Sequence, residues 1–307
     1  MNHPLDQEAM TRLHRQWFSR LGWALFAQMS AMTVAQLLVS AVIRVLRPEL
    51  LAQPAVLWLL SVGSAYGVGF PAALLVLRGL PLRRPPAAPM PPAAFGQALV
   101  TTLGLVYVSN FFTLLLTRLI GAMQGGAVTN PVDSLSSYPP VINLLLGCVI
   151  APITEEFLFR RLLLERLRPY GDRFAILASA LCFGLFHGNL NQFFYACAVG
   201  ALFACIILRT GCLWQTILLH ALTNATTVLL IPLLDQLGEV GSQITTLLVL
   251  GSIVIGLTFL IAGWRDIRLA PASVPLPEEE VWRSFLLSPG VLAFCLLSLL
   301  LAASYLL

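Results

Sequence analysis

TEEFLFR, residues 154–160, places two adjacent carboxylates and a guanidinium inside an otherwise apolar run, 141–167. Each charge in such a run costs at least ~2.5–3.5 kcal/mol on membrane-insertion scales. Glu156 and Arg160 are four residues apart, so on a helix they share one face and can pair. Glu155 points about 100° away from that face and gains no such partner from its own helix. Bracing of the helix through Arg160 is one explanation of the three charges, and chemistry is the other.

The apolar run around this stretch is one of several, which sets the fold class. Apolar residues make up 58% of the chain, charged residues only 10%, and the mean hydropathy is +0.85. Soluble domains average about 25% charged residues. We therefore predict an all-α, polytopic transmembrane helix bundle of about nine spans. The expected spans are 21–43, 55–77, 97–120, 141–167, 174–187, 191–208, 213–230, 244–262 and 285–307.

The spans divide the chain into three expected parts. Residues 1–140 hold an N-terminal amphipathic arm over the first twenty residues and three transmembrane helices. Residues 141–231 hold a core of four helices, and residues 232–307 hold two C-terminal helices. The proline-rich segment 78–94, which contains Arg83 and Arg84, is expected to be an exposed loop.

Two smaller sequence features lie outside the core. Gly63 and Gly67 in the second span have the spacing that is typical of close helix packing. The acidic run Glu278–Glu280 is expected to lie in a solvated loop.

Arginine placement predicts the orientation of the chain. All eighteen basic residues are arginine. With the N-terminus in the cytosol, only Arg44, Arg47 and Arg118 fall outside, which leaves fifteen of the eighteen inside. Arginine without lysine is typical of a genome rich in G and C, so we expect the bacterial inner membrane. The arginines are scattered beside the spans, which argues against a nucleic-acid partner and for the lipid bilayer.

Two further polar sites interrupt the apolar pattern downstream. FGLFH, residues 183–187, closes the fifth span, and HALTN, residues 220–224, lies in the seventh. His187 and His220 are the two of the four histidines that fall in membrane-type segments. Asn224 lies four residues after His220, so the two side chains share a helix face.

These three motifs together resemble the CAAX-protease and bacteriocin-processing family of intramembrane proteases, also called the abortive-infection or lysostaphin-resistance-A-like family. Its pattern is Glu-Glu-x-x-x-Arg, then Phe-x-x-x-His, then His-x-x-x-Asn. The matching residues are Glu155, Glu156, Arg160, Phe183, His187, His220 and Asn224. The resemblance covers residues 141–230 and implies an endopeptidase that cleaves a membrane-associated protein or peptide near its C-terminus.

The resemblance and the chemistry of the residues give the same expected roles. A buried carboxylate beside a histidine can deprotonate a water, which suits Glu155 and His187. His220 and Asn224 can donate hydrogen bonds to the oxyanion of a tetrahedral intermediate. Glu156 and Arg160 would hold the helix and tune Glu155, with Phe183 in a supporting position.

Alternatives to this interpretation concern a metal and a different class of protein. Two histidines and a glutamate can bind zinc, but His-Glu-x-x-His is absent and Asn224 is a poor zinc ligand. We therefore favour a glutamate-activated water with no metal or other cofactor over a zinc-dependent version. Intramembrane charges also mark transporters, although no inverted repeat is visible, and a non-proteolytic scaffold is a further alternative.

The six cysteines complete the sequence analysis. They contain no Cys-x-x-Cys pair, and nearly all lie in apolar spans, where cysteine behaves as a small hydrophobic residue. We therefore expect neither a disulfide nor a cysteine nucleophile.

Overall fold

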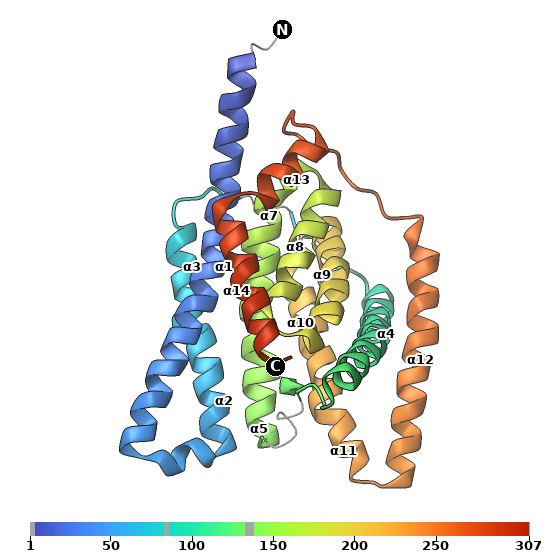
Figure 1. Ribbon diagram of the computed structural model, residues 1–307. Coiled ribbons are helices and arrows are strands. Elements are labelled where there is room, and N and C mark those ends of the chain that lie inside the picture. The colour runs from blue at the N-terminus through green and yellow to red at the C-terminus, as the bar shows by residue number, and fades with distance from the viewer. Residues whose placement is uncertain (1–3, 83–85, 133–137, 307) are drawn as a thin grey trace.

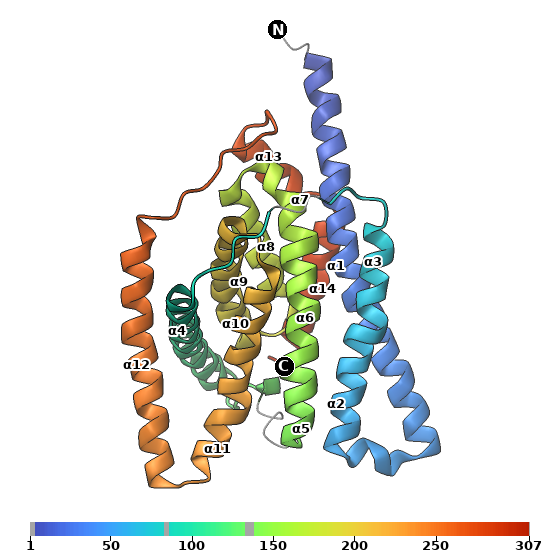
Figure 2. The same cartoon turned by 180° about the vertical axis from the view of Figure 1, so that it is seen from behind.

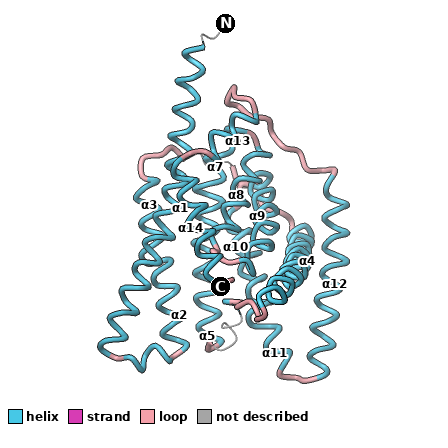
Figure 3. The backbone as a smooth tube through the Cα atoms, viewed as in Figure 1, coloured by secondary structure: helices cyan, strands magenta, loops and turns pink. Residues whose placement is uncertain are grey.

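The computed structural model describes residues 4–82, 86–132 and 138–306, with side chains from Met10 onward. Throughout these ranges the chain forms helices and loops, without strands (Figures 1 and 3). The helices are α1 (Pro4–Leu46), α2 (Pro54–Val62), α3 (Phe70–Leu77), α4 (Pro92–Gln124), α5 (Pro140–Ile142), α6 (Ala151–Glu156), α7 (Glu165–Leu167), α8 (Asp172–Phe186), α9 (Leu190–Thr210), α10 (Leu213–Ala225), α11 (Ile231–Asp235), α12 (Glu239–Trp264), α13 (Glu278–Leu286) and α14 (Pro289–Ser304). The predicted all-α class is confirmed.

Several of these helices are joined by π-helical turns into longer continuous helical segments. Each such segment is called a rod below and is named by its residues. The π-helical segments are Gly63–Gly69, Asn143–Ile150, Phe157–Leu164 and Thr226–Leu230. Seven stretches of the described chain are long and apolar enough to cross a membrane, namely Met10–Leu46, Pro54–Leu77, Pro92–Gln124, Pro140–Tyr170, Leu190–Thr210, Leu213–Asp235 and Glu239–Asp266. The pair α13 and α14, bent by 61°, makes an eighth if it counts as one span.

The difference from the expected nine spans lies in α8. This helix has only 15 residues. At ~1.5 Å per residue it rises about 22 Å, short of the ~30 Å hydrocarbon core of a bilayer. It nevertheless packs along α9 in the interior of the bundle.

The helices are arranged around a central group. The rod 140–170 and the helices α8, α9 and α10 occupy the middle (Figure 1), and the reverse view shows the rod and α10 in front (Figure 2). α1, α2 and α3 cover one side of this group, while α4 and α12 pack together on the other. α14 lies against α1, so both terminal parts of the chain join the same apolar core.

Glycines allow α1 and α14 to approach closely. A Cβ atom on Gly22 would lie 2.1 Å from the backbone nitrogen of Val291, and one on Gly290 would lie 1.9 Å from the carbonyl oxygen of Ser19. The backbone N–H of Gly290 donates to the Ser19 hydroxyl at 3.0 Å. Small residues at such crossings replace the hydrophobic driving force that is missing between helices in lipid.

Three expected boundaries differ from the structure. The arm and the first span form one 43-residue helix, α1, whose N-terminal end projects beyond the bundle (Figure 1). α4 begins at Pro92, inside the expected loop 78–94, because proline is tolerated in the first helical turn. Arg83 and Arg84 lie outside the described residues.

The third difference concerns the acidic run Glu278–Glu280. These residues form the first turn of α13, where negative side chains favour helix formation. Val281 and Phe285 of the same helix are buried in the core, so the segment is an amphipathic helix rather than a solvated loop.

Candidate functional site

An ion pair buried in the rod 140–170 forms the base of the site. Arg160 Nε lies 3.1 Å from Glu156 Oε2, and both side chains are inaccessible to solvent. The guanidinium carbon of Arg160 lies 4.7 Å from the ring centroid of Phe183 and 5.9 Å from that of Phe203. The pair expected from the spacing of Glu156 and Arg160 is present, and two aromatic faces from α8 and α9 support its cation.

Glu155 faces away from this pair and finds its partners on other helices. The Tyr66 hydroxyl, from the π-helical segment Gly63–Gly69, donates to Glu155 Oε1. The other carboxylate oxygen, Oε2, lies 3.9 Å from Nε2 of His220. The Glu155 side chain remains 11% exposed, whereas that of Glu156 is fully covered.

His220 bridges the two glutamates from α10. Its Nδ1 lies 3.1 Å from Glu156 Oε1, at hydrogen-bond distance. With Nδ1–H donated to Glu156, the ring presents Nε2 toward Glu155. The imidazole is therefore held by one carboxylate while its second nitrogen faces the other.

His187 reaches the same region from the C-terminal end of α8. Its Nδ1 donates to the Phe183 carbonyl at 2.8 Å, because a carbonyl oxygen can only accept. Nε2 of the neutral ring is then an acceptor. The ring packs edge-on against Phe183, with centroids 5.0 Å apart, and it lies within electrostatic range of Glu155.

Asn224 occupies a different position from the five ionisable groups of the site. Its Nδ2 donates to the Gly147 carbonyl at 2.9 Å, in the π-helical segment Asn143–Ile150. The amide thus ties α10 to the rod that carries the glutamates. The structure brings Glu155, Glu156, Arg160, Phe183 and His220 into direct contact, places His187 beside them, and anchors Asn224 on the backbone of the same rod.

Two contributors were not predicted from the sequence. Tyr66 lies in the second span, far from the three motifs in the chain, and only a hydroxyl among apolar neighbours distinguished it. Asn189 follows the second motif and caps α9: its Oδ1 accepts from the Gln192 N–H at 2.9 Å, and its Nδ2 donates to the His187 carbonyl at 2.8 Å. An asparagine before an apolar helix is an N-cap signal that sequence analysis could have used.

An apolar hollow of about 370 Å³ lies next to the site. It is lined by Leu59, Val62, Gly63, Tyr66, Gly67, Leu146, Ile150 and Thr154. Among the described residues, no atom lies within 4 Å of a Cβ added to Gly63 or Gly67, so the expected packing face borders this space instead of a neighbouring helix. Tyr66 lines the hollow and also contacts Glu155, which joins the space to the carboxylate.

The possible metal ligands of the site lie on several helices. In the described part of the chain, no three His, Cys, Asp or Glu side chains converge in an arrangement that could hold a metal ion. Nδ1 of His220 is directed to Glu156, and Nδ1 of His187 is bound to a carbonyl. These bonds leave Nε2 as the free nitrogen of each ring. All six cysteines carry free thiols.

A buried Glu–Arg pair, a second glutamate and two histidines inside a helical bundle define a polytopic membrane protein with an intramembrane polar site. Residues 137–226, which hold this site, match the family model described as type II CAAX prenyl endopeptidase Rce1-like. This segment is therefore similar to the CAAX-protease family that the motifs resemble.

A curated relative supports the same assignment. "Putative membrane peptidase YdiL" of Bacillus subtilis (strain 168) is 28% identical over 100 residues, which is 32% of this chain. The matched region spans 40% of that relative's length. No solved structure matches the chain.

Proposed function

We propose that this protein is an intramembrane endopeptidase of the CAAX-protease type, which cleaves a membrane-associated protein or peptide near its C-terminus with a water activated by Glu155. The observation that carries the proposal is the unequal environment of the two glutamates. Arg160 neutralises Glu156 at 3.1 Å, while Glu155 has only the Tyr66 hydroxyl and the more distant His220 ring. The family match of residues 137–226 supports a peptidase.

Glu155 acts as the general base in the proposed mechanism. It takes a proton from a water positioned with Nε2 of His187, and the water oxygen forms a bond to the carbonyl carbon of the scissile peptide. Collapse of the tetrahedral intermediate breaks the C–N bond, and the proton held by Glu155 passes to the departing amine.

Electrostatic stabilisation of the oxyanion is assigned to α10. A doubly protonated His220 ring donates Nδ1–H to Glu156 and Nε2–H to the oxyanion. Asn224 uses one amide hydrogen for the Gly147 carbonyl and has a second one to donate. Glu156 and Arg160 hold the histidine and the rod in place, which makes them positioning residues.

The surroundings of Glu155 suit a substrate that reaches the site from the bilayer. The 370 Å³ hollow beside Tyr66 is lined almost entirely by apolar atoms. An apolar segment of a membrane-associated substrate would lose contact with lipid there and gain contact with Leu59, Leu146 and Ile150.

The test is the cleavage of membrane-anchored peptides by purified protein in detergent, with Glu155→Gln and Glu156→Gln as a matched pair. Glu155→Gln keeps the shape of the side chain and removes the base, so turnover should be lost while the thermal melt stays close to wild type. Glu156→Gln leaves Arg160 with a weakened partner in an apolar setting, so stability or yield should fall first and activity should be reduced.

Turnover per folded molecule decides between the two glutamates. If Glu155→Gln is active while Glu156→Gln is folded but inactive, Glu156 is the general base and Glu155 is the positioning residue. A wild-type protein that cleaves none of a broad set of anchored peptides would contradict the peptidase assignment and favour a transporter or scaffold.

We further propose that the reaction needs no metal. Full turnover is expected to survive prolonged treatment with a strong chelator, and elemental analysis of active protein should find no stoichiometric zinc. Loss of turnover on chelation with recovery on zinc addition would assign His187, His220 and a glutamate as ligands instead.

A further inference from the structure

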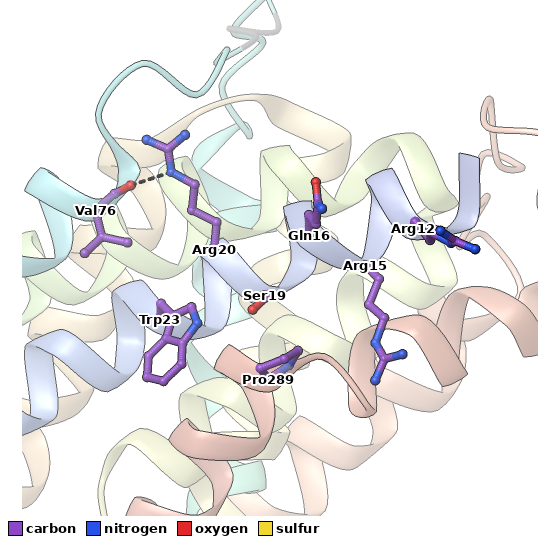
Figure 4. A pocket seen from close by; sticks show the side chains of 8 residues that line it. All are labelled: Arg12, Arg15, Gln16, Ser19, Arg20, Trp23, Val76 and Pro289. Atoms are coloured by element: carbon purple, nitrogen blue, oxygen red, sulfur yellow. Dashed lines mark hydrogen bonds between the residues drawn. The ribbon is translucent and has the colours of Figure 1, made fainter. Parts of the chain in front are cut away.

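A second polar site lies along α1, in a groove whose lining includes none of the residues of the glutamate site. A groove of about 600 Å³ runs beside this helix where α3 ends and α14 begins. Figure 4 shows its lining: three arginines and Trp23 follow one another along α1, and Pro289 closes the groove from α14. The catalytic proposal uses none of these residues.

The groove concentrates positive charge. Arg15 donates to the Leu287 carbonyl at 2.7 Å, and Arg20 donates to the Val76 carbonyl at 2.8 Å and to the Arg78 carbonyl. These acceptors are neutral, and the described residues provide neither arginine with a carboxylate partner. Arg166 also lies close enough to Arg20 to repel it, which adds to the positive field.

The hydrogen bonds hold the two guanidinium groups in fixed directions. Arg20 Nε is directed at Val76, as the dashed line in Figure 4 shows, and Arg15 extends toward the start of α14. Both side chains are exposed, so the donors that the carbonyls do not use are accessible to a ligand. Fixed, exposed guanidinium donors are suited to a phosphate, whose oxygens accept several N–H bonds at once.

The depth of the groove identifies the kind of phosphate. α3 ends at Leu77, so the arginines lie at the level where three membrane helices leave or enter the bilayer. Trp23 is 41% exposed and lies one turn deeper along α1 than Arg20, and Pro289 and Val76 give the groove apolar walls. The arginines therefore lie nearer the membrane surface than the indole of Trp23. A phospholipid has the same order, because its phosphate lies nearer the surface than its glycerol and acyl chains.

We propose that this groove, lined by Arg12, Arg15, Ser19, Arg20, Trp23 and Pro289, binds the headgroup of one anionic phospholipid. Arg15 and Arg20 lie on the two sides of the groove and contact the headgroup from both sides, and the acyl region lies against Trp23. The bound lipid bridges α1 to the end of α3 and the start of α14, and therefore stabilises the attachment of both terminal helices to the core.

The experiment measures lipid binding by protein purified in a neutral detergent. Dioleoylphosphatidylglycerol and dioleoylphosphatidylcholine are titrated separately, with bound lipid counted by native mass spectrometry and stability followed by thermal melts. Phosphatidylglycerol is expected to bind as one molecule per protein and to raise the melting temperature in a concentration-dependent manner. Phosphatidylcholine should bind more weakly and raise it less.

Variants separate the groove from general surface charge. Arg15→Gln should weaken phosphatidylglycerol binding about fivefold, and the double variant Arg15→Gln/Arg20→Gln should weaken it further. Arg15→Lys should retain part of the affinity. Arg265→Gln is the matched control, because Arg265 is an exposed arginine just after α12, away from the groove, and it should bind like wild type.

Three outcomes would overturn the proposal. These are equal binding of the two lipids, an equal loss in Arg265→Gln and Arg15→Gln, and full displacement of phosphatidylglycerol by glycerol phosphate at the same concentration. The last result would define a site for a free phosphate rather than for a lipid. If Arg20 variants fail to fold, Arg15→Gln alone decides the question, because its single bond to Leu287 is exposed.

Discussion

Arg160 shows how one residue can hold a charge in an apolar interior. Its side chain is completely buried, with Glu156 at 3.1 Å and the rings of Phe183 and Phe203 beside its guanidinium. Removing one partner of such a pair leaves an uncompensated buried charge, at a cost of about 3–5 kcal/mol. The cost of placing charges in the apolar run at residues 154–160 is therefore offset by the Glu156–Arg160 ion pair. Glu155 does not take part in this pair.

The spacing of residues predicted the Glu156–Arg160 pair but not the partners of Glu155. A separation of four places two side chains on one helix face whatever the tertiary structure is. By contrast, the contact between Tyr66 and Glu155 joins residues 89 positions apart and depends on which helices are neighbours. No local pattern carries that information, so Tyr66 could be found only in the structure.

The first prediction at the scale of single residues concerns the Tyr66 hydroxyl. Tyr66→Phe removes the one hydroxyl that donates to Glu155 Oε1 and keeps the ring that lines the hollow. We expect kcat to fall about ten- to a hundredfold, the size of a lost charge-assisted hydrogen bond of ~1.5–3 kcal/mol, with KM little changed. Steady-state kinetics on an anchored peptide provides the measurement.

Tyr107→Phe is the matched control for this variant. The Tyr107 hydroxyl is also buried, but it has no hydrogen-bond partner among the described residues. Its removal should leave both kinetic constants unchanged. If Tyr66→Phe keeps wild-type kcat, the hydroxyl does not orient the base.

At the scale of the helix, the turn between α8 and α9 positions His187. α8 ends at Phe186, Gly188 takes a left-handed conformation with φ +59°, and Asn189 caps α9. Glycine adopts this φ without strain, which lets the chain reverse within three residues. The motif Phe-x-x-x-His thus places its histidine at the rigid end of a short helix.

The side-chain oxygen and the amide nitrogen of Asn189 hold this turn in separable ways. Its Oδ1 caps α9 by accepting from the Gln192 N–H, and its Nδ2 donates to the His187 carbonyl and to Gln192 Oε1. Asn189→Ala should lose both, lowering the free energy of unfolding by about 1 kcal/mol and reducing turnover. Asn189→Ser keeps a capping oxygen but has no amide to reach His187.

Serine should therefore restore stability without restoring turnover. Thermal melts and kcat for the two variants in one detergent provide the comparison. Full recovery of turnover in Asn189→Ser would show that the cap alone matters and that the bond to His187 has no effect on the site.

At the scale of the whole molecule, the limits of helical periodicity become visible. Apolar length predicted the long spans well, because a membrane helix needs about 20 residues whatever it packs against. It placed a boundary between the arm and the first span where the composition changes from amphipathic to apolar, but a change of composition does not end a helix, and the two segments form one. It also could not predict that α14 packs on α1, because contacts between the two ends of a chain leave no local signal.

Most arginines lie at one face of the bundle, and the predicted orientation in the membrane rests on this asymmetry. The N-terminal half of α1, the end of α3, α7 and the end of α12 all lie at the top of Figure 1, and Arg20, Arg78, Arg166 and Arg265 lie in or directly after them. The turn between α1 and α2, which holds Arg47, lies at the bottom. Positive residues are retained on the cytosolic side of a membrane, so the top face is expected to be cytosolic.

Two single cysteines, introduced after replacement of the six native ones, test this orientation. Ala87 is exposed in the segment before α4, next to Ala88, whose N–H bonds to Thr210 at the end of α9. Gln53 is exposed at the opposite face, in the turn before α2. In spheroplasts, an impermeant maleimide should label Gln53→Cys at once and Ala87→Cys only after the membrane is opened. Labelling of Ala87→Cys in sealed spheroplasts would show that the orientation is the reverse of the predicted one, with the lipid groove of α1 in the outer leaflet. The excess of arginine on that face would then contradict the positive-inside rule.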